Sequence, residues 1–433
     1  MYSLRKILLP LLTMAFLPGL MAHAGELRAG AARVSITPPA SEFPFTAGRE
    51  KPVVGIHDEV YARALVLDDG SKRVALVMLE VTKVPEAEVI VSSVARELGV
   101  PAAQVMVAAT HTHSVLSTSY RPNAPTPVHQ RDLERIKQGT LDAVRQAARA
   151  LQPARIAFGR GEAWVNVNNG EWLGSAKGAD HSGPSDKSLD VVRVQTAAGA
   201  PLALVVNYAT HAEVMFRSVT KDGGTELSGD LPGAVSRLLE SQPGAAPVVL
   251  FTAGAEGDQL SMFKSLQPAG RLSATDEGAA GWALLNVMAR RVAEAALEVV
   301  AGMPTGESQA RLAAATGVAT CPGQRTSSDA QTGKINIEVQ PPVNIPLSML
   351  RINDLVLAGI GGDVASEIGM AFKKASPVKN STVVTVTAGA TGYILADSSY
   401  EHPGHAVFGS PLKPGCAQQA IVEGLVQLIK KNP

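Results

Sequence analysis

The sequence predicts an α/β fold in which a mixed β-sheet core is flanked by helices within a single large domain. The chain has 433 residues, of which 45% are apolar, so it is long enough to bury a sizeable core. Short apolar runs alternate along it with amphipathic stretches of helical period. No internal repeat, low-complexity tract or linker marks a second domain. Strands that alternate with helices are typical of an α/β domain.

The strands are predicted from apolar runs, many of them nearly continuous and ended by Gly or Asp, as in strands buried on both faces. These runs are 61–70, 73–81, 105–110, 154–161, 191–199, 202–210, 248–257, 352–362 and 381–393. The helices are predicted from amphipathic stretches at 85–99, 132–152, 231–242, 277–300, 363–376 and 416–432. The region from 305 to 350 is richer in turn residues, so we expect an irregular excursion there.

Charge and composition exclude nucleic acid as a partner. Lys plus Arg and Asp plus Glu both number 39, so the net charge is zero. No basic stretch stands out that could bind a phosphate backbone.

The first 24 residues have the pattern of a secretory signal peptide. Arg5 and Lys6 precede a short apolar run, and "AHA" stands directly before Gly25. This pattern predicts cleavage after Ala24 and a secreted or periplasmic protein. The alternative is an anchoring helix, although the run is short for a membrane span and prolines interrupt it.

The chain has two cysteines, Cys321 and Cys416. A disulfide between them is expected in an oxidising compartment. Two buried free thiols are the alternative, because sequence alone does not place the two residues within bridging distance. Neither cysteine lies in a metal-binding motif, so thiolate chemistry is not expected.

Side chains suited to metal binding or acid–base chemistry follow several predicted strands. In "ATHTHS" the two histidines are two positions apart, so an extended strand would point both to one side. Taken alone, they could equally be solvated surface residues. Ligands gather where the strands of such sheets end. The residues at these strand ends are His111, His113, His211, Asp258, Asp363 and Tyr393.

Taken in order, these segments resemble the N-terminal catalytic domain of the neutral/alkaline non-lysosomal ceramidases. The similarity covers nearly all of residues 25–433, and we expect no C-terminal immunoglobulin-like domain like that of the family. It rests on the order and spacing of "GAARVSITPP", "HDEVYARALVLDDG", "ATHTHS", "NYATHA", "SGDLPG", "AGAEGDQ", "GGDVASEIG" and "GYI" followed by "YEHPG".

The resemblance implies a zinc-dependent hydrolase of an N-acyl amide bond, with N-acylsphingosine split into sphingosine and fatty acid as the family's default reaction. Its zinc ligands correspond to His111, His211, Asp363 and Tyr393. Such ligands suit zinc, which can activate water for hydrolysis. His113 would face the substrate and its developing oxyanion. The implied partner is a small molecule or lipid, and a lipid implies transient contact with a membrane surface.

Several positions depart from the family pattern. The acidic ligand is Asp363 where the family has Glu, and Asn169 stands where an Arg is expected. His405 stands where a second tyrosine of the active site is expected, so we predict that it lines the pocket as a catalytic residue. The loop "THTHSVLSTSY" lacks the usual Gly-Pro, and "GDQLSM" replaces "GDVSPN". These changes affect substrate identity more than metal binding, so a hydrolase of another amide or ester, or a non-catalytic exported binding protein, are the alternative functions.

The acidic residues near the predicted site have competing interpretations. Asp363 could instead cap a helix starting near residue 364, with Glu367 on the same helix face as the ligand. Asp258 could cap a helix, or it could orient a ligand histidine by a hydrogen bond, which we favour. Asp230 is predicted to be the N-cap of a helix that begins at Pro232, with a direct role in the site as the alternative.

The remaining histidines are predicted to be structural. His57 and Asp58 are expected to form a turn with an internal hydrogen bond. Exposed loop positions are expected for His129, His181 and His402.

Overall fold

The structure is a computed structural model of the chain, and it describes only part of the sequence. The described residues are 25–45, 51–116, 126–169, 179–244, 246–264, 276–329, 332–401 and 404–433. The predicted signal peptide, residues 117–125 of the loop after "THTHS", and His402 lie outside the described residues.

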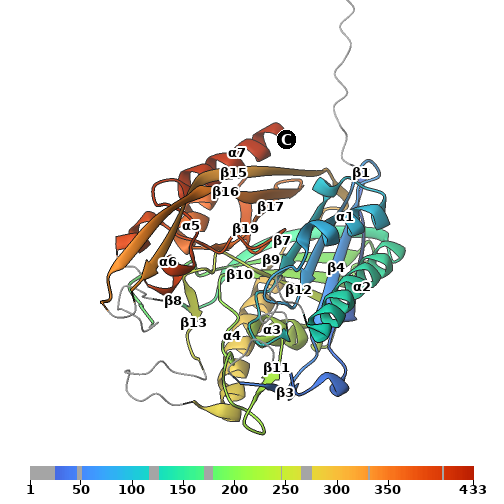
Figure 1. The fold of residues 1–433 in the computed structure, drawn as a ribbon. Helices are drawn as coiled ribbons and strands as arrows, with labels where there is room; N and C mark the ends of the chain where they lie inside the picture. The colour runs from blue at the N-terminus through green and yellow to red at the C-terminus, as the bar shows by residue number, and fades with distance from the viewer. Residues whose placement is uncertain are drawn as a thin grey trace, which may run out of the picture.

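The described residues form four layers, in which two β-sheets pack face to face and helices cover both outer faces (Figure 1). The larger sheet has eight strands and contains both parallel and antiparallel pairs. Its strands lie in the order β12 (Val248–Ala253), β10 (Pro201–Tyr208), β9 (Ser188–Thr196), β7 (Gln152–Glu162), β2 (Arg28–Ser35), β4 (Tyr61–Asp68), β5 (Arg73–Leu79) and β6 (Val105–Ala109). A mixed sheet core flanked by helices is the predicted fold class, which is confirmed.

The second sheet lies between the large sheet and the C-terminal helices. Its strands are β15 (Leu312–Ser328), β16 (Ile335–Ile352), β17 (Leu355–Ile360) and β19 (Asn380–Val384). Along β17, Leu355 and Leu357 pack against the large sheet, whereas Val356 and Ala358 face the helices. Both faces of this strand are therefore buried, which explains why its sequence is an unbroken apolar run.

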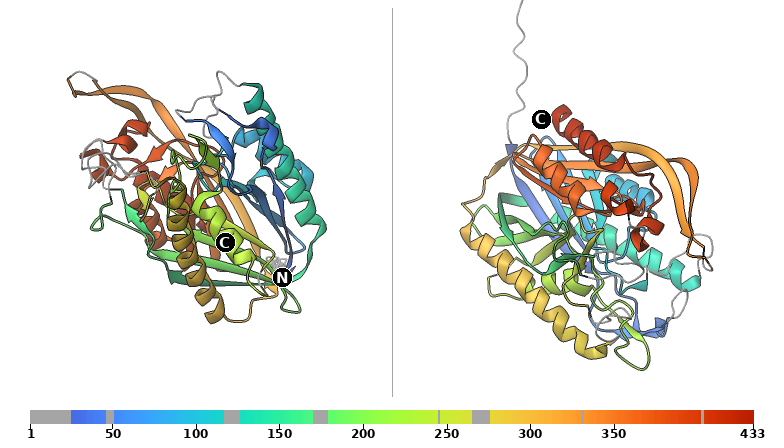
Figure 2. Two further views of the ribbon diagram at one scale, coloured as in Figure 1. Left: turned by 90° about the horizontal axis from the view of Figure 1, so that it is seen from below. Right: turned by 90° about the vertical axis from the view of Figure 1, so that its left-hand side faces the viewer.

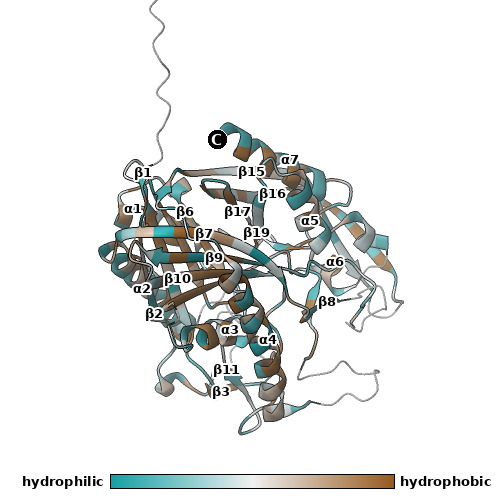
Figure 3. Ribbon diagram, turned by 180° about the vertical axis from the view of Figure 1, so that it is seen from behind, coloured by the Kyte–Doolittle hydropathy of each residue, from teal (hydrophilic) through white to brown (hydrophobic). Residues whose placement is uncertain are grey.

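The helices are divided between the two outer faces. They are α1 (Ala87–Leu98), α2 (Pro127–Arg149), α3 (Asp230–Glu240), α4 (Gly281–Gly302), α5 (Ser366–Ala375), α6 (His405–Gly409) and α7 (Ala417–Lys431). α1 to α4 cover the large sheet, while α5 and α7 cover the second sheet (Figure 2). Seen from behind, β9 and β10 are mainly hydrophobic, whereas α4 carries both kinds of residue (Figure 3). This is the amphipathic pattern expected of helices that cover a sheet.

Four two-stranded ladders complete the described structure. They pair β1 (Gly25–Glu26) with β14 (Gln309–Ala310), β3 (Val53–Ile56) with β11 (Thr225–Leu227), β8 (Asn166–Asn168) with β13 (Gln259–Ser261), and β18 (Asp363–Val364) with β20 (Tyr393–Ile394).

The large sheet curls so that its edge strands β6 and β12 approach each other. The segment that follows β19 joins their ends. Thr385 donates its backbone N–H to the carbonyl of Ala253 at the end of β12 (2.9 Å). At the end of β6, Ala109 donates its N–H to the carbonyl of Val386 (3.3 Å). The carboxyl ends of β6, β10 and β12 are thereby brought to one place, although β6 and β10 are far apart in strand order.

The region from 305 to 350 is regular, contrary to the prediction of an irregular excursion. β15 and β16 form a long antiparallel hairpin with Leu312 opposite Ile352 and Ser328 opposite Ile335. Pro322, Gly323, Pro341 and Pro342 lie where the register shifts between Cys321 and Gly323, whereas Gly317 and Pro346 are paired in regular register. Turn residues therefore mark an irregularity inside the hairpin, not a loop.

Cys321 and Cys416 form a disulfide, so the expected disulfide is confirmed and the alternative of two free thiols is wrong. The bridge joins residues 95 positions apart and ties the hairpin to the start of α7. Closing a loop of this size typically stabilises a fold by about 2–4 kcal/mol.

In the described part of the chain, none of the helices combines the length and the hydropathy that crossing a bilayer requires.

Candidate metal centre

Two of the predicted histidines follow β6 directly. This strand is apolar and wholly buried, and Thr110 after it still donates its N–H to the carbonyl of Leu79. The backbone then turns sharply at His111, whose φ is +63°, a left-handed conformation uncommon outside glycine. His113 donates its backbone N–H to the carbonyl of Ala212 (3.0 Å), so the chain after β6 is held against the chain after β10.

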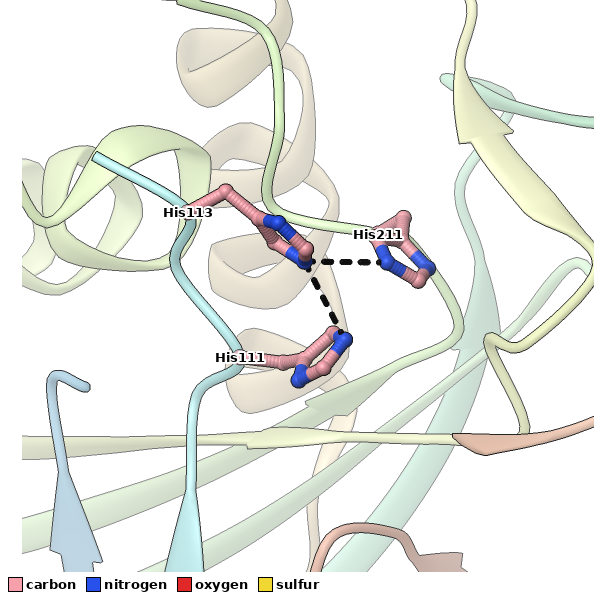
Figure 4. A group of neighbouring side chains, drawn as sticks. All are labelled: His111, His113 and His211. Atoms are coloured by element: carbon pink, nitrogen blue, oxygen red, sulfur yellow. Dashed lines mark hydrogen bonds between the residues drawn. The ribbon is translucent and has the colours of Figure 1, made fainter. Parts of the chain in front are cut away.

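The imidazoles of His111, His113 and His211 converge, as Figure 4 shows. The Nε2 atom of His113 lies 3.2 Å from Nε2 of His111 and 3.2 Å from Nε2 of His211. His111 and His211 are buried, with 5% and 3% of their surface exposed. The prediction that residues from separate strand ends gather at one site is correct for these three.

The other nitrogen of His111 fixes how its ring is protonated. Nδ1 lies 2.6 Å from the carbonyl oxygen of Thr82, which can only accept a hydrogen bond. A neutral His111 therefore carries its proton on Nδ1, and the lone pair of Nε2 points into the cluster. This is the protonation state in which histidine binds a metal through Nε2.

Asp363 joins the cluster from β18, which follows β17 in the chain. Its Oδ2 lies 3.6 Å from Nε2 of His111. The pairing of β18 with β20 places it opposite Tyr393. A Cβ at Gly362 would lie 2.8 Å from the carbonyl of Gly392, so a glycine is needed for the backbone to approach this closely. Gly362 therefore lets β18 lie close against β20.

Glu256 is the residue of this cluster that the sequence analysis missed. It follows β12 in the turn "AGAEGDQ", is fully buried, and its Oε2 lies 2.6 Å from Nδ1 of His211. The carboxylates of Glu256 and Asp363, together with a nitrogen of His111, lie within 4.8 Å of one another. The sequence did contain a signal for this residue. Glu256 and Asp258 both stand at the end of the same predicted strand, and we considered only Asp258.

The two carboxylates respond differently to the cluster. Burial by itself raises the pKa of Glu256, but the neighbouring His211 and His111 outweigh it and hold that pKa below its usual value. Burial also raises the pKa of Asp363, and the nearby charge of Glu256 adds to this increase. Two buried carboxylates facing imidazole nitrogens form a donor set that fits a divalent cation such as zinc.

Tyr393 and His405 lie on one side of the cluster. The ring centre of Tyr393 is 6.4 Å from that of His211, and the two rings are nearly parallel. His405, the first residue of α6, meets the Tyr393 ring edge-on at 5.7 Å and is exposed. Tyr393 therefore lies beside the histidines. His405 contacts Tyr393 and lies farther from the histidines.

Asp258 does not orient a histidine, so the interpretation we favoured is wrong. Its Oδ1 accepts the backbone N–H of Ser366 (2.8 Å) and its Oδ2 accepts the Ser366 hydroxyl (3.0 Å), so it caps the start of α5. Burial raises the pKa of Asp258 to about 6. Because α5 begins only at Ser366, Asp363 lies before the helix and neither caps it nor shares a helix face with Glu367. Glu367 instead accepts a hydrogen bond from the Ser398 hydroxyl (3.0 Å).

Asp230 is the first residue of α3, not its N-cap. Its Oδ1 accepts the backbone N–H of Val214 (3.1 Å) and that of Leu231 (2.7 Å). Its Oδ2 accepts the N–H of Met215 (3.0 Å). Asp230 therefore holds the chain just after His211 against the start of α3. Burial raises the pKa of Asp230 to about 6.

The other predicted structural residues are also placed. Asp58 accepts hydrogen bonds from the Ser228 hydroxyl (2.7 Å) and the Gly229 N–H (2.9 Å), so its contacts reach another segment and not its own turn. His57 stacks on Trp282, with ring centres 3.6 Å apart.

Of the three histidines expected at exposed loop positions, the structure describes His129 and His181, and the expectation is confirmed for only one of them. His181 is exposed. His129 is buried in the first turn of α2, where it completes a capping box with Thr126, so the prediction of an exposed loop is wrong for it. Its position two residues after Pro127 resembled a loop, but Pro is also common in the first turn of a helix.

A cavity of about 180 Å³ is lined mostly by residues with polar side chains, among them Asn169, the residue that departs from the family's arginine. Three of its lining residues, Asp258, Leu395 and Ala406, are close in sequence to Glu256, Tyr393 and His405. Its lining is Asn168, Asn169, Asp180, Pro184, Asp258, Glu367, Leu395, Ser398, Ser399 and Ala406.

Two curated proteins are similar in sequence to part of this chain. Neutral ceramidase A of Dictyostelium discoideum is 26% identical over 227 residues, which cover 47% of this chain and 31% of that relative. Neutral ceramidase B of the same organism is 27% identical over 226 residues, with the same coverage. The matched part thus spans about a third of the length of these relatives.

Solved structures share the fold across almost the whole chain. The neutral ceramidase from Pseudomonas aeruginosa superposes with a TM-score of 0.72 at 18% identity, covering 95% of this chain and 76% of that one. A ceramidase complexed with C2 gives a TM-score of 0.72 at 18% identity, covering 94% and 76%. The family model described as "Neutral/alkaline non-lysosomal ceramidase, N-terminal" matches residues 27–258, more than half of the sequence. The chain therefore belongs to the neutral/alkaline non-lysosomal ceramidase family.

Proposed function

We propose that this protein is a zinc-dependent hydrolase of an N-acyl amide bond, with N-acylsphingosine as its substrate. The observation that carries the proposal is the convergence of three imidazoles, with Nε2 of His113 3.2 Å from Nε2 of His111 and of His211, beside the buried carboxylate of Asp363. Imidazole and carboxylate donors are the ligands that zinc takes in hydrolases. The names of its relatives supply the substrate class.

The residues that would hold the metal are His111 and His211 through Nε2, Asp363 through its carboxylate, and Tyr393 through its phenolic oxygen. Zinc bound there would supply Lewis acidity, which polarises a carbonyl and lowers the pKa of water. Thr82 holds His111 in the protonation state that leaves Nε2 free to bind. Asp230 keeps the chain after His211 in place.

His113 is the residue placed to act on the substrate. Its Nε2 faces the same point as those of His111 and His211, and its ring rests against Phe216 with ring centres 5.1 Å apart. A neutral His113 protonated on Nε2, or a doubly protonated one, can donate a hydrogen bond to the oxygen of an amide carbonyl as negative charge develops there. His405 is placed further out, beside Tyr393, where it can contact the substrate at the rim of the site.

Replacing the acidic ligand tests how the metal is held. Asp363→Asn should weaken zinc affinity by more than about a hundredfold, the upper end for a residue that only orients a ligand, and abolish amide hydrolysis, because a neutral amide is a poor zinc ligand. Glu367→Gln is the matched control, since Glu367 bonds to Ser398 and lies outside the cluster. Zinc affinity is measured by competition with a chelator, and turnover by fatty acid release. Normal zinc binding in Asp363→Asn with its loss in Glu367→Gln would transfer the ligand role to Glu367.

Export of the protein is part of the proposal. A cleaved signal peptide and a disulfide both fit a secreted or periplasmic location. N-terminal sequencing of the protein recovered from a periplasmic extract or the culture medium should give Gly25 as the first residue. A chain that keeps Met1 and stays with the cell interior would contradict export.

The substrate class is tested with a panel of N-acyl amides and esters of different chain length. N-acylsphingosines should be hydrolysed best. Preference for another amide or an ester would keep the hydrolase and reject the ceramide substrate. No turnover of any of them by zinc-loaded protein would favour a binding protein that retains the fold.

A further inference from the structure

We propose that Glu256 is a positioning residue that holds His211 in the protonation state and orientation needed to bind a metal through Nε2. The proposal rests on the zinc site proposed above. Glu256 is fully buried, and its Oε2 lies 2.6 Å from Nδ1 of His211. Its own backbone carbonyl oxygen lies 3.3 Å from the same nitrogen. Two oxygens of one residue thus face Nδ1 of His211.

These contacts determine where the imidazole proton resides. A carboxylate and a carbonyl oxygen both accept hydrogen bonds and cannot donate them. A neutral His211 therefore carries its proton on Nδ1, and its Nε2 lone pair points toward His113, 3.2 Å away, and into the cluster. The opposite tautomer would put a lone pair against the carboxylate and a proton where the metal binds.

His111 and His211 are oriented by different kinds of acceptor. Nδ1 of His111 faces a neutral carbonyl, that of Thr82. Nδ1 of His211 faces a carboxylate, which makes the imidazole a stronger base and hence a stronger metal ligand. The two ligand histidines are therefore not equivalent, and His211 should be the stronger donor.

Glu256 is itself held in place from the other side. Its Oε1 accepts a hydrogen bond from the Thr385 hydroxyl (3.2 Å), and Thr385 is bonded through its backbone to the end of β12. A fully buried carboxylate costs several kcal/mol unless it is paired. The polar groups that contact the Glu256 carboxylate are the His211 imidazole and the Thr385 hydroxyl.

Glu256 could alternatively bind the metal directly, because its carboxylate lies within 4.8 Å of donor atoms of His111 and Asp363. The short distance to His211 Nδ1 favours the positioning role. The two roles predict different outcomes when the charge is removed and the shape is kept. Glu256→Gln does this, because glutamine is uncharged but retains a carbonyl oxygen that can accept a hydrogen bond from the Nδ1–H of His211.

The first test is zinc affinity, measured by competition with a chelator on folded protein. Glu256→Gln should bind one zinc per chain about tenfold to a hundredfold more weakly than the wild type. Glu367→Gln, a carboxylate outside the cluster, should bind as the wild type does. Unchanged zinc affinity in Glu256→Gln would overturn the proposal. Loss of metal as complete as in His211→Ala would also overturn it, because Glu256 would then be a ligand.

The second test reads the tautomer directly in the wild-type protein, and His211→Ala serves only to assign the signals. Long-range ¹H–¹⁵N spectra of metal-free protein with labelled histidine should show His211 protonated on Nδ1, its signals being assigned by their loss in His211→Ala. A proton on Nε2 would overturn the proposal even if Glu256→Gln failed to fold. Neither readout uses turnover, so a protein that shows both results but hydrolyses no N-acyl amide would contradict the proposed function alone.

Discussion

His111→Ala and His211→Ala should each leave the purified protein without zinc, whereas the wild type carries about one zinc per chain. Each variant removes one of the imidazoles whose Nε2 atoms converge in the buried cluster. The remaining donors cannot complete the coordination that a catalytic zinc needs. Elemental analysis of dialysed protein measures the ratio directly.

The control for these variants is His181→Ala, because His181 is exposed and lies outside the cluster. It should retain zinc at the wild-type ratio. Circular dichroism and thermal unfolding of His111→Ala and His211→Ala would show that the fold survives. Wild-type protein that holds no metal and takes none up would contradict the proposed site.

His113→Ala should retain zinc but lose about a hundredfold or more in kcat, since its proposed contact is made to charge that develops in the transition state. The side chain faces the metal cluster from the side of Phe216, while Thr82 and Glu256 orient the other two histidines. Removing it leaves both proposed histidine ligands and Asp363 in place. Steady-state kinetics and metal analysis of the same preparation measure the two effects together.

His113→Gln provides the matched comparison, because its amide can still donate a hydrogen bond. It should recover part of the activity that His113→Ala loses. If His113→Ala instead lost zinc as completely as His111→Ala, His113 would be a third histidine ligand. That result would reverse the assignment of roles within "HTH".

The sequence predicted the regular part of the fold well because buried strands and amphipathic helices have distinct periodicities. The apolar run before the first histidine pair is β6, and the run at 248–257 contains β12. The long hairpin was missed for a physical reason. Along its distal half, Ile337 and Val339 are exposed, at 65% and 86%, and prolines interrupt the alternation, so the residues carry no burial pattern that predicts a strand.

The sequence predicted side chains that could bind a metal, but not the contacts that hold those side chains in place. Residues that end separate buried strands indicated His111, His211 and Asp363, and the structure brings them together. Glu256 was missed because two acidic residues, two positions apart in "AGAEGDQ", follow the same strand. Sequence spacing does not show which of them faces a histidine, since that depends on how the turn after β12 lies against α5.

The placement of His113 could not be predicted either. Two histidines at alternate positions of an extended strand would point the same way. The left-handed backbone at His111 breaks that regularity, and the His113 backbone is fixed by a bond to Ala212 from another strand end. Both features depend on the closing of the large sheet, which no local pattern in the sequence records. That the chain forms one catalytic domain stays a prediction.

Zinc-dependent turnover of a short-chain N-acylsphingosine tests the central claim most directly. Fatty acid release is measured with wild-type protein as purified, after removal of metal by a chelator, and after return of zinc. The account predicts activity in the first state, its loss in the second and its recovery in the third. Activity that persists in fully metal-free protein, or zinc-loaded protein that releases no fatty acid, would contradict it.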